Sequence, residues 1–197
     1  MARSKDPILK RCRALGIEPG YLGYNKSSNK NPKKGNRKVS EYGIQLKEKQ
    51  KTKFVYGVSE KQFRRYFDMA SKARGKTGEK LLTLLESRLD NVVYRLGFAS
   101  SRPQARMLVT HAIFEVNGKK VNIPSYLVKV GDVISVRENK KDNGTIKANQ
   151  ELSESVVVPT WLEKEKDKLA GKVVREPARE DVEIPIEEHL IVELYSK

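Results

Sequence analysis

The sequence is poor in the residues that build disulfides, metal sites and membrane spans. It has one cysteine, Cys12, and two histidines, His111 and His189. A single cysteine excludes an internal disulfide and is typical of a reducing compartment, and these residues are too few for a Cys-rich zinc site. No apolar run approaches the roughly 18 residues of a membrane span, and the first residues lack the apolar core of a secretion signal. We therefore expect a cytoplasmic protein with no metal, no cofactor and no membrane partner.

Acidic residues are scarce in most of the chain but not at its end. The net charge is +15, from 40 Lys and Arg against 25 Asp and Glu. Residues 1–80 carry 22 basic and 7 acidic side chains, residues 81–149 carry 11 and 6, and residues 150–197 carry 7 and 12. The basic part predicts a polyanionic partner, and the acidic end predicts a basic protein neighbour. A small-molecule substrate is not expected.

A complete phosphate-binding loop is also missing. The stretch RGKTGEK (74–80) contains the Gly-Lys-Thr with which such a loop ends. The loop needs a further glycine five positions before Gly75, where Ala70 stands, and it needs a strand before it, where the sequence is helical. The sequence therefore predicts a turn between two helices here and no NTPase.

Residues 23–38 carry six basic residues and no acid, which predicts a basic arm that becomes ordered on phosphate. Three helices are expected after it. Ser40 precedes the first, and Ser59 with Gln62 forms a capping box for the second, whose Arg64 and Arg65 lie off the apolar stripe. The third is predicted to run without a break from Thr77 to Leu96, because its apolar residues keep helical spacing up to Gly97.

The stretch SRLDN (87–91) in that long helix resembles the surroundings of the catalytic aspartate in pseudouridine synthases. We expect Asp90, in mid-helix between Arg88 and Arg95, to be a solvated charge. The alternative is an RNA-modifying enzyme that uses Asp90, and it would need a catalytic domain for which the chain has little room. A turnover assay on bulk RNA would separate the two.

Residues 100–138 predict a helix followed by a hairpin and a strand. Ser101 and Gln104 are expected to form a second capping box, and Arg102 and Arg106 to share an outward face with no acidic partner. Asn117-Gly118 supplies the two positive φ angles of a tight hairpin turn, which places Lys119 and Lys120 at its tip. Glu115, on the same hairpin, would repel phosphate if it pointed the same way.

After residue 139 we expect a loop, then a short helix or turn around a buried Trp161, then a strand, and a docked C-terminal segment. The predicted fold class is α+β with an antiparallel sheet. The predicted domains are a basic arm (1–39), a helical domain (40–85) joined by residues 186–197, a small helix-helix-hairpin-strand module (86–138), and an extension packed on the module (139–185).

Several stretches resemble the family of bacterial small-subunit ribosomal protein S-four. They are VSEYGIQLKEKQK, YGVSEKQFRRYF, KTGEKLLTLLESRLDNVVYRLGFASSRPQAR, VNGKKVNIPSYLVKVGDVISVRE, PTWL and EEHLIVELYSK. Residues 86–138 look like the RNA-binding module named after that family, which recurs in pseudouridine synthases and tyrosyl-tRNA synthetases. Many members have a Cys-x-x-Cys zinc motif where this chain has Leu9 and Cys12, so it resembles the zinc-free branch.

The resemblance implies a structural protein that binds ribosomal RNA at a multi-helix junction of the 5′ domain and nucleates small-subunit assembly. It implies contact with ribosomal protein S-five, a part in translational fidelity, and a contribution of Lys33, Lys34, Arg37 and Lys38 to the channel that messenger RNA enters. Because the acidic end of a basic protein suits a protein neighbour better than RNA, we expect Glu187 and Glu188 to face S-five. A stress-related or regulatory RNA binder remains an alternative. The expected ribosomal RNA contacts are Arg3, Lys10, Arg11, Arg13, Lys47, Lys49, Lys53, Arg64, Arg65, Lys72, Arg74, Lys76, Arg88, Arg102, Gln104, Arg106, Lys119, Lys120 and Tyr126.

Overall fold

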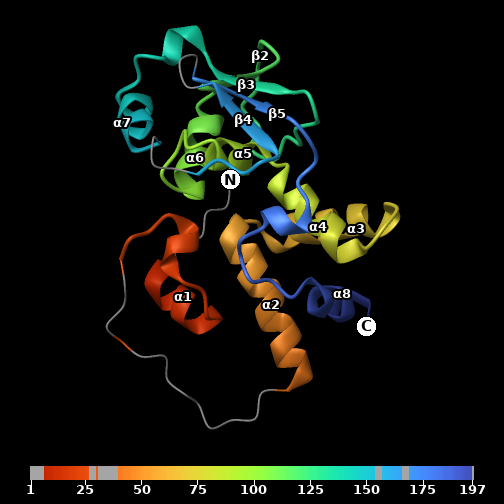
Figure 1. The fold of residues 1–197 in the computed structure, drawn as a ribbon. Coiled ribbons are helices and arrows are strands. Elements are labelled where there is room, and N and C mark those ends of the chain that lie inside the picture. Colours follow the sequence, from red (N-terminus) through yellow and green to blue (C-terminus); the bar gives the residue numbers. More distant parts are fainter. Residues whose placement is uncertain (1–6, 27–29, 31–39, 154–156, 166–168, 197) are drawn as a thin grey trace. The chain divides into compact units, whose positions relative to one another are not determined.

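The computed structural model describes residues 7–26, 30, 40–153, 157–165 and 169–196 (Figure 1). The chain divides into two compact units, with the division inside a helix between Leu82 and Thr83. The first unit holds residues 1–82 and 183–197, and the second holds residues 83–182. Of the basic stretch 23–38, which was predicted to become ordered on phosphate, only residues 23–26 and 30 lie within the described part.

The first unit is helical. Its elements are α1 (Ile8–Leu15), the 3-10 turn η1 (Pro19–Leu22), α2 (Glu41–Tyr56), α3 (Glu60–Lys72), the first part of α4 (Thr77–Glu86), and α8 (Glu188–Ser196). Two predicted helix starts are confirmed, because the hydroxyl of Ser40 accepts a hydrogen bond from the Gly43 N–H and that of Ser59 accepts one from the Gln62 N–H. The turn predicted between α3 and α4 is also confirmed.

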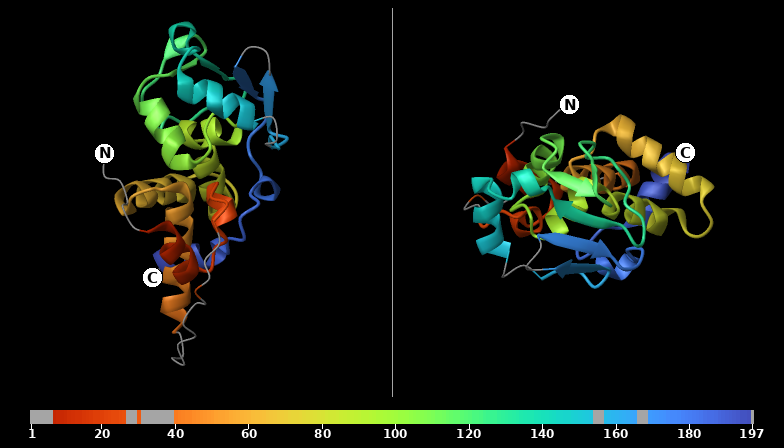
Figure 2. Two further views of the ribbon diagram at one scale, coloured as in Figure 1. Left: turned by 90° about the vertical axis from the view of Figure 1, so that its left-hand side faces the viewer. Right: turned by 90° about the horizontal axis from the view of Figure 1, so that it is seen from above.

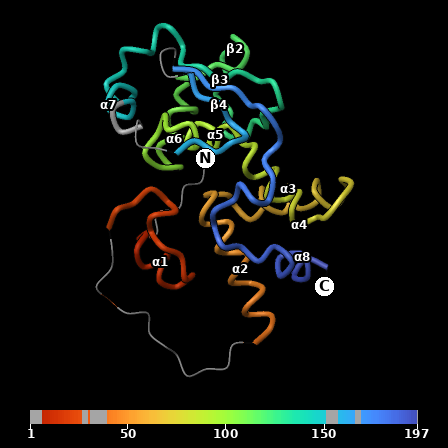
Figure 3. Tube along the Cα trace, in the orientation of Figure 1, coloured from red at the N-terminus to blue at the C-terminus, as the bar shows by residue number. Residues whose placement is uncertain are grey.

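The C-terminal helix α8 packs beside α2, although the two are far apart in sequence (Figure 3). The side-chain amide of Gln45, on α2, donates to Glu193 Oε2 at 3.0 Å. Glu48 Oε1, one helical turn further along α2, accepts from the Glu187 N–H at 2.9 Å. Ile191 is fully buried. The last segment of the chain is therefore part of the helical unit's fold.

The second unit combines helices with one five-stranded sheet. Its helices are the rest of α4, α5 (Leu89–Arg95), α6 (Arg102–Thr110) and α7 (Gly144–Ser153), with 3-10 turns η2 (Glu138–Lys140) and η3 (Arg179–Asp181). Its strands are β1 (Phe114–Val116), β2 (Lys119–Lys120), β3 (Val133–Val136), β4 (Leu162–Glu165) and β5 (Ala170–Val173). They lie side by side in the order β2-β1-β3-β5-β4, and every neighbouring pair is antiparallel (Figure 2). The α+β class is confirmed.

The predicted hairpin is confirmed as well. Asn117 and Gly118 have φ angles of 51° and 73°, and β1 pairs with β2 across them. The core of this unit forms between α5, α6 and the sheet, where Phe114, Ile134 and Trp161 are each 0 % exposed. The prediction that Trp161 is a core residue is therefore correct.

The long helix predicted from Thr77 to Leu96 is wrong, because the helix breaks at Ser87 and Arg88. Arg88 has extended angles, φ −70° and ψ 137°, and forms an isolated antiparallel bridge with Leu127. The segment 124–128 provides the bonds that a continuous helix would have made internally. Its carbonyls at Tyr126 and Pro124 accept from the Leu89 and Asp90 N–H groups, at 2.8 and 3.2 Å. These tertiary hydrogen bonds override the helical pattern of the apolar residues.

Two further predictions are corrected. The loop expected after residue 139 contains α7, which is tied to the core by buried Ile146 and by the Asn149 side chain, whose amide donates to the Phe98 carbonyl. By contrast, the turn predicted around Trp161 is confirmed, and it leads into strand β4 as expected. The second capping box is also wrong, since Ser101 makes no capping hydrogen bond.

Candidate nucleic-acid interface

The helical unit carries most of the basic residues expected to contact RNA. They come from α1, from one part of α2, from α3 and from the turn that follows it. Those that are exposed are Lys10, Arg11, Lys47, Arg64, Arg65, Lys72, Arg74 and Lys76, while Arg13, Lys49 and Lys53 are half-buried. Most of these cations are therefore available to a large anion at the surface of this unit.

Glu60 holds the half-buried lysines in place. Its carboxylate accepts from Lys49 Nζ at 3.0 Å, from Lys53 Nζ at 2.5 Å and from the Tyr195 hydroxyl at 2.8 Å. Burial by itself would raise the pKa of Glu60, but these hydrogen bonds outweigh burial and lower that pKa to about 2. Burial and the bond to Glu60 raise the pKa of Tyr195. At neutral pH the Glu60 carboxylate is therefore ionised, and it lies between the ammonium groups of Lys49 and Lys53.

The second unit presents basic residues at the β1–β2 hairpin. Lys119 and Lys120 are both exposed. Glu115 lies directly opposite Lys120 in the strand pairing, so the two side chains share one side of the sheet. Glu115 is half-buried and accepts a hydrogen bond from the Ser135 hydroxyl at 3.0 Å. The carboxylate is thus engaged within the sheet beside the exposed lysines. Tyr126 is 37 % exposed on the loop that docks at the helix break.

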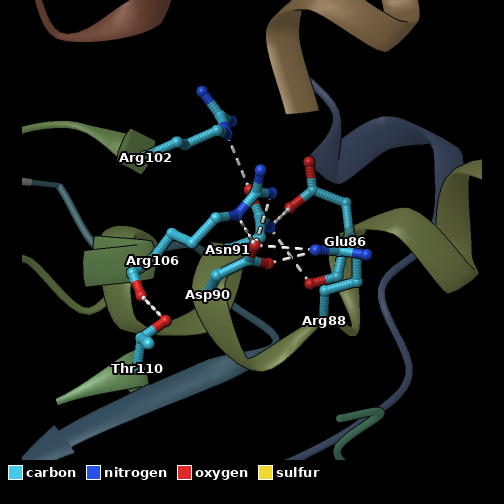
Figure 4. Close-up of polar contacts among 7 residues, drawn as sticks. All are labelled: Glu86, Arg88, Asp90, Asn91, Arg102, Arg106 and Thr110. Atoms are coloured by element: carbon cyan, nitrogen blue, oxygen red, sulfur yellow. Dashed lines mark hydrogen bonds and ion pairs between the residues drawn. The ribbon is translucent and has the colours of Figure 1, made fainter. Parts of the chain in front are cut away.

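A buried polar network joins α4, α5 and α6, and its first half is centred on Asp90 (Figure 4). Arg88 donates from Nε to Oδ1 at 3.0 Å and from Nη2 to Oδ2 at 2.7 Å. Arg106 donates from Nε and Nη2 to Oδ2, at 2.8 and 2.6 Å. One buried carboxylate thus lies between two guanidinium groups.

The other half is centred on Glu86, which is 0 % exposed. Arg95 donates to both of its carboxylate oxygens, at 3.1 and 3.0 Å, and the Asn91 side-chain amide donates at 2.6 Å. Asn91 Oδ1 in turn accepts from Arg102 Nε at 2.8 Å. The Arg102 guanidinium also lies over the Tyr94 ring, 4.4 Å from its centroid. The arginine network consists of Glu86, Arg88, Asp90, Asn91, Arg95, Arg102 and Arg106.

This network corrects two expectations. Asp90 is not a solvated charge, because it is 3 % exposed and bonded to two arginines. Arg102 and Arg106 are not an outward pair without acidic partners, because Arg106 pairs with Asp90 and Arg102 is 5 % exposed and held by Asn91. The helix break explains both results, since it starts α5 at Leu89 and turns the acidic residue toward α6.

Several network members escaped sequence reasoning. Glu86, Asn91 and Arg95 were not expected to have a role, and the available signal was the set of charged residues Glu86, Arg88, Asp90 and Arg95 within a stretch that is otherwise rich in Leu and Val. Gln104, expected to contact RNA, accepts hydrogen bonds from the Ser100 N–H and hydroxyl.

The remaining predicted residues divide into two groups. Glu187 is exposed and Glu188 is half-buried at the start of α8. Arg3, Lys33, Lys34, Arg37 and Lys38 lie outside the described residues.

In the part of the chain that the structure describes, no group of three or more Cys, His, Asp or Glu is arranged to hold a metal ion. Within that same part, none of the helices combines the length and the apolar character needed to cross a bilayer.

A strongly basic helical unit joined to an α+β unit with exposed lysines on a hairpin is the arrangement of a nucleic-acid-binding protein. Comparison with known proteins agrees. The family model described as "Ribosomal protein S4/S9 N-terminal domain" matches residues 3–86, and the model described as "S4 domain" matches residues 87–134. The chain therefore belongs to the uS4 family of small ribosomal subunit proteins. It is a structural ribosomal protein and not an enzyme, so the alternative of an RNA-modifying enzyme is wrong.

Individual relatives show how far the similarity extends. The chain is 56 % identical to small ribosomal subunit protein uS4 of Agathobacter rectalis and 54 % identical to that of Lachnospira eligens, in each case over 197 residues and the whole of both chains. It is 63 % identical to the uS4 protein of Caldicellulosiruptor bescii over 161 residues, which are 82 % of this chain and 77 % of the relative. The similarity thus includes both structural units.

Proposed function

We propose that this chain binds small-subunit ribosomal RNA directly, at a multi-helix junction of the 5′ domain, and nucleates assembly of the subunit in the cytoplasm. The observation that carries the proposal is the pair of adjacent S4-family matches, over residues 3–86 and 87–134, on a chain whose helical unit exposes most of the cations expected to contact RNA. Binding at a junction suits a folded protein, because structured RNA is recognised mainly by its shape and backbone.

Each unit has its own part in the proposed mechanism. The exposed cations of α1, α2 and α3 attract the phosphate backbone and release counterions, which supplies affinity that falls with salt. Phosphate contacts alone position a protein but do not select a site. Selection comes from side chains with a fixed arrangement, and the arginine network and the β1–β2 hairpin supply these in the second unit.

A protein neighbour is proposed for the acidic end of the chain. The Glu187 side chain is exposed, while its backbone N–H is held by Glu48, so the carboxylate is presented from an anchored position. A basic surface on ribosomal protein S-five is a suitable partner for it and for Glu188. That interaction would connect this chain to translational fidelity. The proposed part of Lys33, Lys34, Arg37 and Lys38 along the path of messenger RNA stays a prediction from the sequence.

Sedimentation tests the ribosomal assignment against a transient regulatory role. The tagged chain is expressed in cells, and ribosomal subunits are separated on a sucrose gradient. We expect one copy for each small subunit, as for a structural component. A chain that stays at the top of the gradient, or that is present in a small fraction of subunits, would contradict the proposal and favour a regulatory RNA binder.

A further inference from the structure

Asp90 binds two arginines of different accessibility. The Arg88 side chain is 2 % exposed and the Asp90 side chain is 4 % exposed, whereas the Arg106 side chain keeps 20 % of its exposure. Arg88 therefore lies inside with the carboxylate, and Arg106 extends from it toward the surface. The three groups together carry one net positive charge, and Arg106 is the one that reaches solvent.

The bonds to Asp90 also fix the direction of Arg106. Two nitrogens of one guanidinium, Nε and Nη2, donate to the single oxygen Oδ2, at 2.8 and 2.6 Å (Figure 4). A hydrogen bond from Nε defines the side-chain torsions more narrowly than a bond from a terminal nitrogen, because Nε lies next to the flexible stem. An arginine held in this way loses little rotational freedom when it meets phosphate.

Arg102 differs from Arg106 although both belong to α6. Arg102 is 5 % exposed, and its guanidinium is held between Asn91 and the ring of Tyr94. Its place is within the packing of α5 against α6. Of the two α6 arginines, Arg106 is the one positioned to meet a ligand.

We propose that Asp90 is a positioning residue for RNA binding and that it acts through Arg106, the member of the arginine network that contacts phosphate. This inference rests on the proposed function. It predicts a change in RNA affinity opposite to the one that charge alone would produce. Loss of the Asp90 carboxylate makes the protein more basic, which would strengthen binding to any polyanion. If Asp90 positions Arg106, its loss weakens binding instead.

The test compares two substitutions that remove one negative charge each. Asp90→Asn removes the buried carboxylate, and Glu163→Gln removes an exposed one on β4. Binding to the 5′ domain of small-subunit ribosomal RNA is measured at one salt concentration, after far-UV circular dichroism has shown that each variant is folded. We expect Asp90→Asn to bind about threefold to tenfold more weakly. Without the carboxylate the Arg106 side chain is mobile in the free protein, and RNA binding must then supply the free energy that orders it. Glu163→Gln should bind as tightly as the unmodified chain or more tightly.

An Arg106→Ala background separates positioning from a general structural effect. If Asp90 acts through Arg106, Asp90→Asn has no further effect on RNA binding in that background. If it loosens the whole unit, the loss is the same in both backgrounds and the inference fails. Should Asp90→Asn not fold, Arg106→Lys replaces it. That change keeps the charge but cannot reproduce the two-nitrogen hydrogen bond, so it should weaken binding. Arg175→Lys is the matched control, because Arg175 is exposed, also donates two hydrogen bonds to an aspartate, Asp181, and is not an expected RNA contact, so this change should leave binding unchanged.

The proposed function and this inference can fail separately. An unmodified chain that binds the 5′ domain no better than an unrelated structured RNA would contradict the proposed function. An unmodified chain that prefers the 5′ domain, together with an Asp90→Asn variant that binds as tightly as Glu163→Gln, would overturn only the positioning role.

Discussion

Replacement of Glu86 by glutamine should be among the most destabilising single changes in the second unit. The carboxylate is 0 % exposed and accepts two bonds from Arg95 and one from Asn91. A glutamine of the same size removes the charge, and its NH2 group faces donors where an oxygen had accepted. Arg95, whose side chain is 8 % exposed, is then left without its counter-charge.

The expected loss follows from removing one partner of a buried ion pair. Such a change costs about 3–5 kcal/mol, because the remaining charge stays desolvated. We expect about 3 kcal/mol for Glu86→Gln, a large fraction of the roughly 5–15 kcal/mol by which domains are stable. A double variant with Glu86→Leu and Arg95→Met removes both charges and should regain part of that loss.

Urea denaturation followed by Trp161 fluorescence measures this loss. Trp161 is the single tryptophan of the chain and is fully buried in the same unit, so its emission reports on that unit's unfolding. Asp142→Asn serves as the control, because it also removes a paired carboxylate from this unit but one that is 96 % exposed. The control should leave the midpoint unchanged. A Glu86→Gln midpoint equal to that of the control, with an equal urea slope, would refute the stabilising role of the network.

Three other predictions concern packing, pH and salt. Gly171→Ala should lower the free energy of unfolding by about 1–3 kcal/mol, because the added Cβ would lie 2.5 Å from a methyl carbon of buried Leu96. Thermal denaturation measures this loss. Gly144→Ala is the control and should cause no such loss, because an added Cβ there meets open space. Glu60 is ionised in the folded state down to about pH 2 but takes up a proton near pH 4.5 when unfolded, so its contribution to stability is present above pH 4.5 and is lost as the pH falls toward 2. Acid titrations of the chain and of Glu60→Gln should therefore converge in that range, and parallel curves would contradict this assignment. Alanine at both positions of Lys119–Lys120 should lower the salt slope of RNA binding by about one unit for each phosphate that is no longer neutralised, with an unchanged denaturation midpoint. An unchanged slope would remove the hairpin tip from the interface.

Features that depend on neighbouring residues could be predicted from the sequence. A serine hydroxyl reaches an N–H group only three residues away, so the helix starts at Ser40 and Ser59 are local properties. The hairpin at Asn117-Gly118 is local in the same sense, because positive φ angles restrict the residues that the turn accepts.

Features that depend on distant residues could not be predicted. The break at Arg88 requires the carbonyls of Pro124 and Tyr126, more than thirty positions along the chain, and the apolar spacing of the sequence gives no sign of it. Asp90 meets Arg106 only because the break sets α5 against α6. The same reason explains why a carboxylate that looks solvated in the sequence is buried between Arg88 and Arg106.

Recognition of RNA by shape differs from simple attraction by charge in its response to salt. Binding to the 5′ domain of small-subunit ribosomal RNA is therefore titrated with salt, beside an unrelated structured RNA of equal length. If the folded chain recognises the shape of the ribosomal RNA, the 5′ domain keeps an advantage of several kcal/mol at salt concentrations that remove the control RNA, and this is the result we expect. Equal affinities with parallel salt slopes would contradict shape recognition and would reduce the interaction to net charge.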